Sequence, residues 1–158
     1  MYANEKVIFE QLSVDNADFI YALYSHPQLA EYFDESPFIQ NETPLLFTKR
    51  ISSHCAYIFT IRPADQPNLI MGECALHHYN QQKRAIEIGG SLLPEFWGQG
   101  FMQSAFELLT TIAKQELGVE TLIGQTNARN YRAIRLAEKM GFEKQPSGNG
   151  SVTMRKDI

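Results

Sequence analysis

The middle of the sequence alternates between apolar and polar side chains in three consecutive runs. These runs are AYIFTIRP (56–63), LIMGECALHHY (69–79) and AIEIGGSLL (85–93). Alternation with a period of two is typical of strands whose two faces differ in burial, and the segments between the runs, ADQPN and NQQKR, are rich in turn-forming residues. The pattern predicts an antiparallel meander of three strands at the centre of the fold.

Segments on both sides of the meander favour helices and further strands. Apolar residues with helical spacing predict a helix over 102–116 that packs one face on the sheet. Asp15 is a suitable N-cap for a helix after the first strand. A chain of 158 residues is long enough for one core, so we expect a single α/β domain over residues 1–158, with a mixed and mostly antiparallel sheet. The other expected elements are strands at 5–13 and 121–126, helices starting at Pro27 and over 43–53 and 130–140, and a terminal hairpin made of GFEKQ, the turn PSGNG and SVTMRKD.

Charge and composition exclude some classes of protein. A formal net charge of −4 argues against binding to DNA or RNA, whose phosphates are held by clustered lysine and arginine. The first residues lack the basic and apolar blocks of a signal peptide, and no apolar run is long enough to cross a bilayer, so we expect a cytoplasmic protein without membrane contact. Cys55 and Cys74 lack CxxC spacing and are interpreted as buried free thiols, with a disulfide or a metal role as the alternative, and no metal site is expected.

Two glycines, Gly98 and Gly100, lie between the last strand of the meander and the helix that follows. A tight turn with positive φ is one explanation for them. A dinucleotide-binding fingerprint is not formed, because the third glycine and the parallel βαβ setting are missing, and a Walker loop is not formed, because no Gly-Lys-Ser/Thr follows. The remaining explanation is a phosphate cradle, in which main-chain amides at a helix N-terminus point at an anion and the absent β-carbons allow close approach.

Gly89 and Gly90 lie inside the preceding strand. Glycine weakens a strand and often marks a bulge or a place where another molecule meets the main chain. A strand that bends outward here would open a cleft beside the next strand, TLIGQT, which leads to Asn130 at the start of another helix. The phosphate-cradle explanation gains support, because such a cleft would end at a second helix N-terminus.

The segments EIGGSLLPEFWGQGFMQSA (87–105) and TNARNYRAIRLAEKMGF (126–142) together resemble the GNAT superfamily of acetyl-CoA-dependent N-acetyltransferases. Within that superfamily the sequence looks most like the branch that contains the ribosomal-protein N-terminal acetyltransferases. The resemblance implies acetyl-CoA as the cosubstrate, a central strand pair that splays around the pantetheine arm, and a loop that binds the pyrophosphate. It also implies cofactor-binding roles for main-chain groups of Leu92, Leu93, Gly98, Gln99, Gly100, Phe101 and Met102, and for Asn130.

Two positions depart from the pattern of the family. Glu95 stands where the family loop often begins with glutamine or arginine, so a carboxylate replaces a helpful donor. Ala133 stands where this branch often has a serine whose hydroxyl serves the leaving sulfur. The resemblance implies an N-acetyltransferase, and Ala133 leaves open the alternative of a regulatory domain that binds acetyl-CoA with little or no turnover.

Glu87 is the first candidate for a catalytic base, because it is a carboxylate on the strand that is expected to splay; a structural or solvent-facing role is the alternative. A base matters most for lysine-like amines of pKa near 10.4, whose deprotonation at pH 7 costs roughly 4.6 kcal/mol, against about 1 kcal/mol for an α-amine. His77 and His78 are adjacent in a predicted strand, so we expect them on opposite faces, with at most one toward the cleft. Tyr131 is the candidate to replace the missing serine hydroxyl, with simple packing as its alternative role.

The segment EYFDES (31–36) places three carboxylates around two aromatic rings, in the region that lines the acceptor side in this family. Such a rim favours a primary amine as the partner, on a protein N-terminus or on a small molecule, although surface solvation explains the same charges. Basic side chains on the last helix, Arg132 among them, either meet the phosphates of the cofactor or form a solvated face. Phe96 and Trp97 either anchor the loop against the core or mediate self-association, which leaves a homodimer open.

Overall fold

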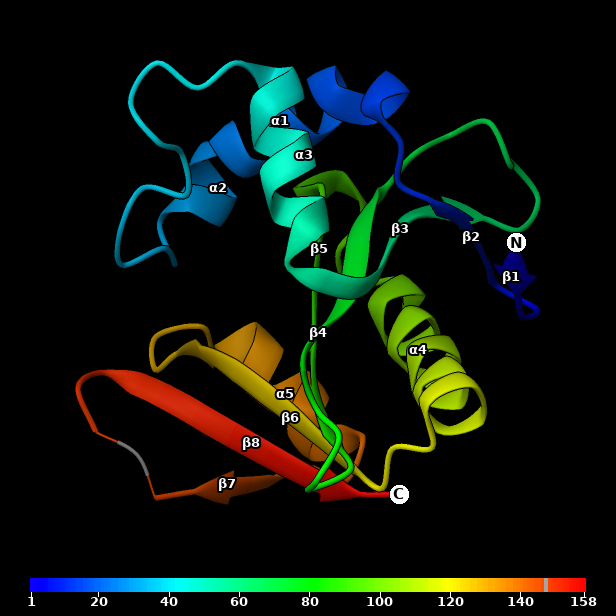
Figure 1. The fold of residues 1–158 in the computed structure, drawn as a ribbon, viewed down its shortest axis with the longest axis vertical. Coiled ribbons are helices and arrows are strands. Elements are labelled where there is room, and N and C mark those ends of the chain that lie inside the picture. Colours follow the sequence, from blue (N-terminus) through cyan, green and yellow to red (C-terminus); the bar gives the residue numbers. More distant parts are fainter. Residues whose placement is uncertain (147) are drawn as a thin grey trace.

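The computed structural model describes residues 1–146 and 148–158, which form one eight-stranded sheet flanked by helices (Figure 1). The strand order across the sheet is β1-β2-β3-β4-β5-β6-β8-β7. Within the described residues every strand pairing is antiparallel except that of β5 with β6, so the predicted mixed, mostly antiparallel α/β class is confirmed. The strands are β1 (Tyr2–Ala3), β2 (Val7–Gln11), β3 (Cys55–Pro63), β4 (Gly72–Asn80), β5 (Ala85–Leu92), β6 (Thr121–Asn127), β7 (Glu143–Gln145) and β8 (Ser151–Asp157).

The α-helices lie close to the predicted positions. No helix in the described part of the chain is long and apolar enough to cross a membrane. The predicted terminal hairpin forms as β7 and β8, and its turn PSGNG contains residue 147, which lies outside the described residues. The α-helices are α1 (Ala17–Ser25), α2 (Pro27–Ala30), α3 (Pro44–Ser53), α4 (Phe101–Leu117) and α5 (Tyr131–Lys139).

The start of the first helix differs from the prediction. Ser13, not Asp15, is the capping residue: its side chain accepts a hydrogen bond from the amide of Asp15, and its own amide donates to the side chain of Asn16 at 3.0 Å. A short 3-10 turn over Val14–Asn16 follows this capping box, and α1 begins only at Ala17. A serine hydroxyl and an asparagine amide satisfy the free amides here, so the carboxylate of Asp15 is not needed as a cap.

The predicted meander forms as β3, β4 and β5. β4 and β5 run in unbroken register from Gly72 opposite Leu92 to His77 opposite Glu87. The register then shifts between His77 and Asn80, near the hairpin. The irregularity of this strand pair therefore lies at the end of β4 and not at the two strand glycines, where a bulge was one of the predicted explanations.

Gly90 is required by the close approach of the neighbouring strand. A β-carbon at this position would lie 2.7 Å from the carbonyl oxygen of Glu73 and 3.0 Å from the β-carbon of Cys74. At Gly89 the nearest atom to an added β-carbon would be Nε2 of His77, at 3.4 Å. Gly90 thus has a structural reason inside the sheet, whereas an added β-carbon at Gly89 would be in ordinary van der Waals contact.

Helices cover both faces of the sheet. α4 packs on β2, β4 and β5, and Cys74 and Leu76 of β4 belong to the same buried cluster as its apolar face. α1 and α3 cover the opposite face, where Ala75 packs with Ile20 and Phe47. Adjacent residues of β4 thus belong to different clusters, as expected of a strand that is buried on both sides. In Figure 1, β6, β7, β8 and α5 occupy the lower part of the view, with α1 to α3 above.

β5 and β6 part soon after they meet. They pair in parallel only over 85–87 with 121–123. β5 continues to Leu92 and β6 to Asn127 without further pairing between them in the described residues, while β6 is paired with β8 along its whole length. The predicted splay of the central strand pair is therefore confirmed, and main-chain groups of β5 beyond Glu87 face a gap where a neighbouring strand would lie.

Both cysteines are free, as predicted. Cys74 is buried and Cys55 is half-buried. Burial, with a smaller contribution from the charge of Glu73, raises the pKa of the Cys55 thiol to about 11 and that of Cys74 well above its usual value. Because the thiolate is the reactive form, both residues are expected to be inert at neutral pH.

Candidate active site

The loop between β5 and α4 presents main-chain amides without partners. Gly98 and Gly100 have φ angles of +74° and +82°, which glycine adopts without steric cost. Gly100 is the N-cap of α4, and no side chain caps this helix. Within the described residues, none of the amides of residues 98–103 donates a hydrogen bond to a protein group. Because these amides lie at the positive end of the helix dipole, the loop is suited to bind an anion such as a phosphate.

Lys6 fixes this loop from the other end of the chain. Its Nζ donates to the main-chain oxygen of Gln99 at 2.5 Å and lies 5.1 Å from the centroid of the Phe101 ring. The side-chain amide of Gln99 in turn donates to the carbonyl of Glu95 at 3.0 Å. A positive charge thus lies beside the loop, which adds to its suitability for an anion. Sequence reasoning missed Lys6, because a lone lysine 93 residues from Gln99 belongs to no motif.

A pocket of about 330 Å³ lies in the gap between β5 and β6. Of the predicted cofactor-binding residues, Leu92, Met102 and Asn130 line this pocket. Ala133 also lines it, so the hydroxyl that the family often places here is missing from the pocket itself. The pocket is lined by residues of α4 and α5 and also by Phe33, which follows α2. Because α2 and α4 lie on opposite faces of the sheet, the pocket passes through the gap from one face to the other.

The main chain of β5 offers hydrogen-bonding groups to the pocket at Gly90 and Leu92. The amide of Leu93 donates to the carbonyl of Met71 at 2.9 Å, so Leu93 is directed toward the β4 side. Successive residues of an antiparallel strand direct their main-chain groups to opposite neighbours, which turns Gly90 and Leu92 toward the gap. Gly90 is exposed in the middle of a strand, as this arrangement requires. Gly90 and the amide of Leu92 thus face the pocket, whereas the amide of Leu93 is bonded to the carbonyl of Met71; the pantetheine contacts of Leu92 and Leu93 stay a prediction.

Asn130 forms the N-terminus of α5 at the end of β6. Its Oδ1 accepts from the amide of Ala133 at 3.3 Å, and its Nδ2 donates to Oγ1 of Thr126 at 3.1 Å. These bonds hold the start of α5 beside the pocket. The neighbouring Tyr131 is 66% exposed and does not line the pocket, so the structure does not bring it together with the other predicted residues.

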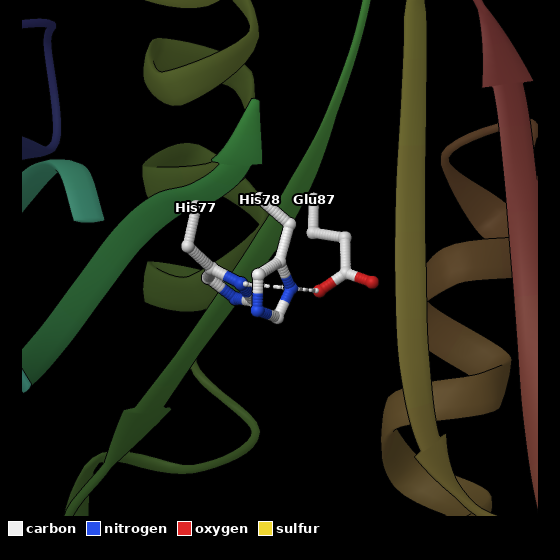
Figure 2. Close-up of side chains that lie close together, drawn as sticks. All are labelled: His77, His78 and Glu87. Carbon is white, nitrogen blue, oxygen red and sulfur yellow. Dashed lines mark hydrogen bonds and ion pairs between the residues drawn. The ribbon is translucent and has the colours of Figure 1, made fainter. Parts of the chain in front are cut away.

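Glu87 lies beside two histidines (Figure 2). Its Oε2 is 2.5 Å from Nδ1 of His78 and 3.1 Å from Nδ1 of His77, and the two Nδ1 atoms are 3.2 Å apart. Its Oε1 accepts from Nε2 of Gln125 at 2.9 Å. Gln125 lines the pocket, so Glu87 is connected to the pocket through this one hydrogen bond.

The expectation that His77 and His78 point to opposite faces is wrong. His78 has a φ of +51°, and the register of β4 with β5 shifts between His77 and Asn80. The regular alternation of side chains fails at such a shift, and both imidazole rings turn toward the same carboxylate. A cluster of three polar side chains results, from two strands.

Hydrogen bonds keep the Glu87 carboxyl ionised. The bond with His77 is the largest effect, partial burial opposes it, and the bond with His78 adds to it, so the pKa of Glu87 lies below its usual value. At neutral pH the group is a carboxylate. A lowered pKa also makes it a weaker base than an ordinary glutamate.

The acidic segment after α2 borders a second pocket, of about 410 Å³. Tyr24 and Phe33 line this pocket together with the carboxylates Asp34 and Glu35. Asp34 also accepts a hydrogen bond from Nδ2 of Asn127 at 2.8 Å, which ties the acidic segment to the end of β6. The predicted acidic and aromatic rim therefore lies beside the gap between the strands.

Glu73 is a buried carboxyl that sequence reasoning missed. It is 4% exposed, and its Oε1 accepts a hydrogen bond from the hydroxyl of Tyr24 at 2.8 Å. Burial raises the pKa of Glu73 to about 7, against the opposing effect of the Tyr24 bond. The available signal was a glutamate in an otherwise apolar run, 69–76.

Trp97 anchors the loop against the core, which confirms one of the two predicted interpretations. Its indole N–H donates to the carbonyl of Leu92 at 2.9 Å, and its ring packs against the main buried cluster. The guanidinium of Arg132 lies 3.8 Å from the centroid of the ring, a cation–π contact at the edge of the first pocket.

A sheet that parts, a pocket in the gap and a helix N-terminus suited to bind an anion beside it are typical of the acyl-CoA-dependent acyltransferases. Residues 6–143 match the family model of the Acetyltransferase (GNAT) domain. The chain belongs to this family and is an acetyl-CoA-dependent acyltransferase. The resemblance drawn from the two sequence segments is confirmed at the level of the family.

Individual relatives are distant in sequence and close in structure. "Uncharacterized N-acetyltransferase YoaA" of Bacillus subtilis (strain 168) is 24% identical over 145 residues, which cover 89% of this chain and 81% of that protein. The structure of spermidine N-acetyltransferase from Vibrio cholerae in complex with CoA and spermine matches with a TM-score of 0.78 at 20% identity, covering 96% and 94% of the two chains. RimL, a ribosomal L7/L12 alpha-N-protein acetyltransferase in complex with CoA, matches with a TM-score of 0.80 at 14% identity, covering 98% and 96%.

Proposed function

We propose that this protein transfers the acetyl group of acetyl-CoA to a primary amine by direct attack in a ternary complex. The observation that carries the proposal is the pocket where β5 and β6 part, with the free amides of residues 98–103 next to it. The loop matches the chemistry of a pyrophosphate, and the pocket matches that of an uncharged chain with a thioester.

The chain's own residues position the two reactants. Acetyl-CoA supplies an activated acetyl group as its thioester. Amides of residues 98–103 bind phosphate oxygens, and main-chain groups of Gly90 and the amide of Leu92 offer hydrogen bonds inside the gap, since the Leu92 carbonyl already accepts from Trp97. A main-chain amide of β5 in the gap also stabilises the oxyanion that develops on the acetyl carbonyl.

Glu87 acts mainly through its charge in this proposal. A carboxylate attracts a cationic amine and stabilises the positive charge that grows on nitrogen during attack. Because its pKa is lowered, Glu87 does not hold the released proton firmly. His78, whose side chain is 69% exposed and contacts Glu87, offers the proton a route to solvent.

The leaving thiolate needs no strong acid. A thiol of pKa about 8.5 is a tolerable leaving group near neutral pH, and acid catalysis typically contributes about 10² to 10⁴ in rate. Ala133 therefore limits the rate without abolishing turnover. A role for Tyr131 in protonating the sulfur stays a prediction.

The acceptor that the second pocket favours is a cation, on a small amine or a protein N-terminus. Asp34 and Glu35 beside Tyr24 and Phe33 provide negative charge and aromatic faces, both of which attract cationic groups. The names of the structural relatives, a spermidine N-acetyltransferase and a ribosomal-protein acetyltransferase, agree with either kind of acceptor.

Binding and turnover are tested on the full chain. Acetyl-CoA at about 100 times its Kd is expected to stabilise the fold by about 2.7 kcal/mol, which raises Tm by roughly 5–10 °C. Free thiol should then accumulate when spermidine, a lysine derivative or a peptide with a free N-terminus is added. Stabilisation without thiol release from any of these amines would contradict the proposal and favour a regulatory domain.

The variant Gly98→Ala tests the loop. An added β-carbon meets no protein atom within 4 Å, so the fold tolerates the change apart from the cost of a φ of +74°. We expect the KM for acetyl-CoA to rise at least about tenfold, because the methyl group keeps the phosphates from the main chain.

Gly118→Ala is the matched control for that variant. Gly118 ends α4 with a φ of +62° and also has no protein atom within 4 Å of an added β-carbon. Both variants therefore carry a similar backbone strain, but only Gly98 lies in the loop. Equal KM values for acetyl-CoA in the two variants would refute a cofactor-binding role of the loop.

A further inference from the structure

His77, His78 and Glu87 bring three metal-binding atoms to one point on the surface of the sheet (Figure 2). The atoms are the two Nδ1 nitrogens and Oε2 of the carboxylate, separated by 3.2, 3.1 and 2.5 Å. Each neutral ring has one N–H, and if both rings donate it from Nδ1 to Oε2, the two Nδ1 atoms 3.2 Å apart are both donors and form no hydrogen bond with each other. The arrangement is better suited to a cation placed among the three atoms.

The backbone is held in an uncommon conformation to form this cluster. His78 has a φ of +51°, which costs a residue with a side chain roughly 1 kcal/mol or more. In a regular strand His78 would turn away from Glu87. The His77 ring lies next to Gly89, because a β-carbon there would be in van der Waals contact with Nε2 at 3.4 Å. The two rings thus converge at a cost in backbone strain, which is often found at functional sites.

The separations match those of a three-ligand metal site. Ligand atoms about 2.1 Å from one ion lie about 3.0 to 3.4 Å apart for octahedral or tetrahedral angles. The distances from His77 Nδ1 to the other two atoms, 3.2 and 3.1 Å, already fall in this range. Only the 2.5 Å contact between His78 and Glu87 must lengthen, and the exposed His78 side chain is free of the core.

We propose that His77, His78 and Glu87 form a binding site for a divalent transition-metal ion, with zinc as the representative. Imidazole nitrogens and one carboxylate suit Zn²⁺ and exclude Mg²⁺ and Ca²⁺, which prefer oxygen ligands. Gln125 holds the other carboxylate oxygen at 2.9 Å and orients it, as outer partners do in metal sites. Three protein ligands leave a coordination position open toward solvent.

The ion would act on the acetyl transfer, a consequence that rests on the proposed function. Zinc on Oε2 of Glu87 neutralises the negative charge that attracts the amine. It also occupies the histidine route for the proton. Zinc is therefore expected to inhibit the reaction, with half-inhibition at the free zinc concentration that half-fills the site.

Zinc binding is measured by calorimetry on the tag-free, full-length protein, independently of activity. The wild-type chain is expected to bind one Zn²⁺ with a Kd below about 100 μM, and Mg²⁺ should give no heat. His78→Ala should weaken zinc at least about tenfold, because one of three ligands is lost. His26→Ala is the matched control: this histidine caps α2 and is not part of the cluster, so its loss should leave the Kd unchanged.

Two further measurements separate the possible results. Glu87→Gln provides a second variant if His78→Ala does not fold by circular dichroism, and it should also weaken zinc at least about tenfold. A wild-type Kd above about 100 μM, or a Kd that neither variant changes, overturns the metal site. If zinc binds through His78 and no amine is acetylated, the metal site stands and the proposed function fails; if amines are acetylated without inhibition by bound zinc, the inhibitory role is overturned.

Discussion

Replacing Glu87 by glutamine is expected to lower kcat/KM for a lysine-like amine by at least about 100-fold. Glutamine keeps the shape of the side chain and can still accept a hydrogen bond from Gln125 at its oxygen. It removes the charge that attracts the ammonium group and stabilises positive charge in the transition state. Initial rates of thiol release at saturating acetyl-CoA, with a lysine derivative as acceptor, measure the effect.

The same variant should affect an α-amine less. Deprotonation at pH 7 costs about 1 kcal/mol for an α-amine and roughly 4.6 kcal/mol for a lysine-like amine, so the second depends more on the carboxylate. Glu143→Gln removes an exposed carboxylate on β7 and should leave both rates unchanged. Equal losses for the two amines would show that Glu87 supports the site structurally and does not serve the proton chemistry.

The strands, the loop and the helix that surround the site were predictable from the sequence, because the patterns that specify them are local. The period of two across 56–93 gave the meander, and Gly98 and Gly100 marked a loop whose φ angles are indeed positive. Helical spacing after the loop predicted α4, which begins one residue earlier than expected, at Phe101. Each of these features depends on neighbours within a few residues, so a single sequence contains enough information to place it.

Side chains that meet across the fold were not predictable in this way. Lys6 and Gln99 are 93 residues apart, and Tyr24 and Glu73 are 49 apart. Nothing near either partner in the sequence indicates the other. The prediction for His77 and His78 failed for a different reason. It assumed the regular alternation of a strand, which does not hold at His78 because the register shifts there and φ is positive.

Glu73 shows what such a missed contact means for stability. Its pKa is about 7 in the folded protein, mainly because burial disfavours the charged form, and its ordinary value is 4.5. Between these two values the folded chain holds a proton that the unfolded chain has lost. Stability from this group is therefore complete below about pH 4.5 and falls as the pH rises, until it levels off above pH 7. The total loss corresponds to about 3 kcal/mol.

The variant Glu73→Gln should remove this pH dependence. The amide oxygen of glutamine can accept the hydrogen bond of Tyr24, and the side chain does not ionise, so the variant avoids a buried charge at high pH. We expect the free energy of unfolding of the variant, relative to the wild type, to rise by roughly 2–3 kcal/mol between pH 5 and pH 8. Urea unfolding at the two pH values measures this difference, and all other titrating groups cancel in it. Glu143→Gln, the exposed control, should show no such change. The contradicting result is a stability difference between wild type and Glu73→Gln that stays constant from pH 5 to pH 8. It would mean that Glu73 ionises as readily in the folded state as in the unfolded state, because water reaches it through the second pocket, which Tyr24 lines.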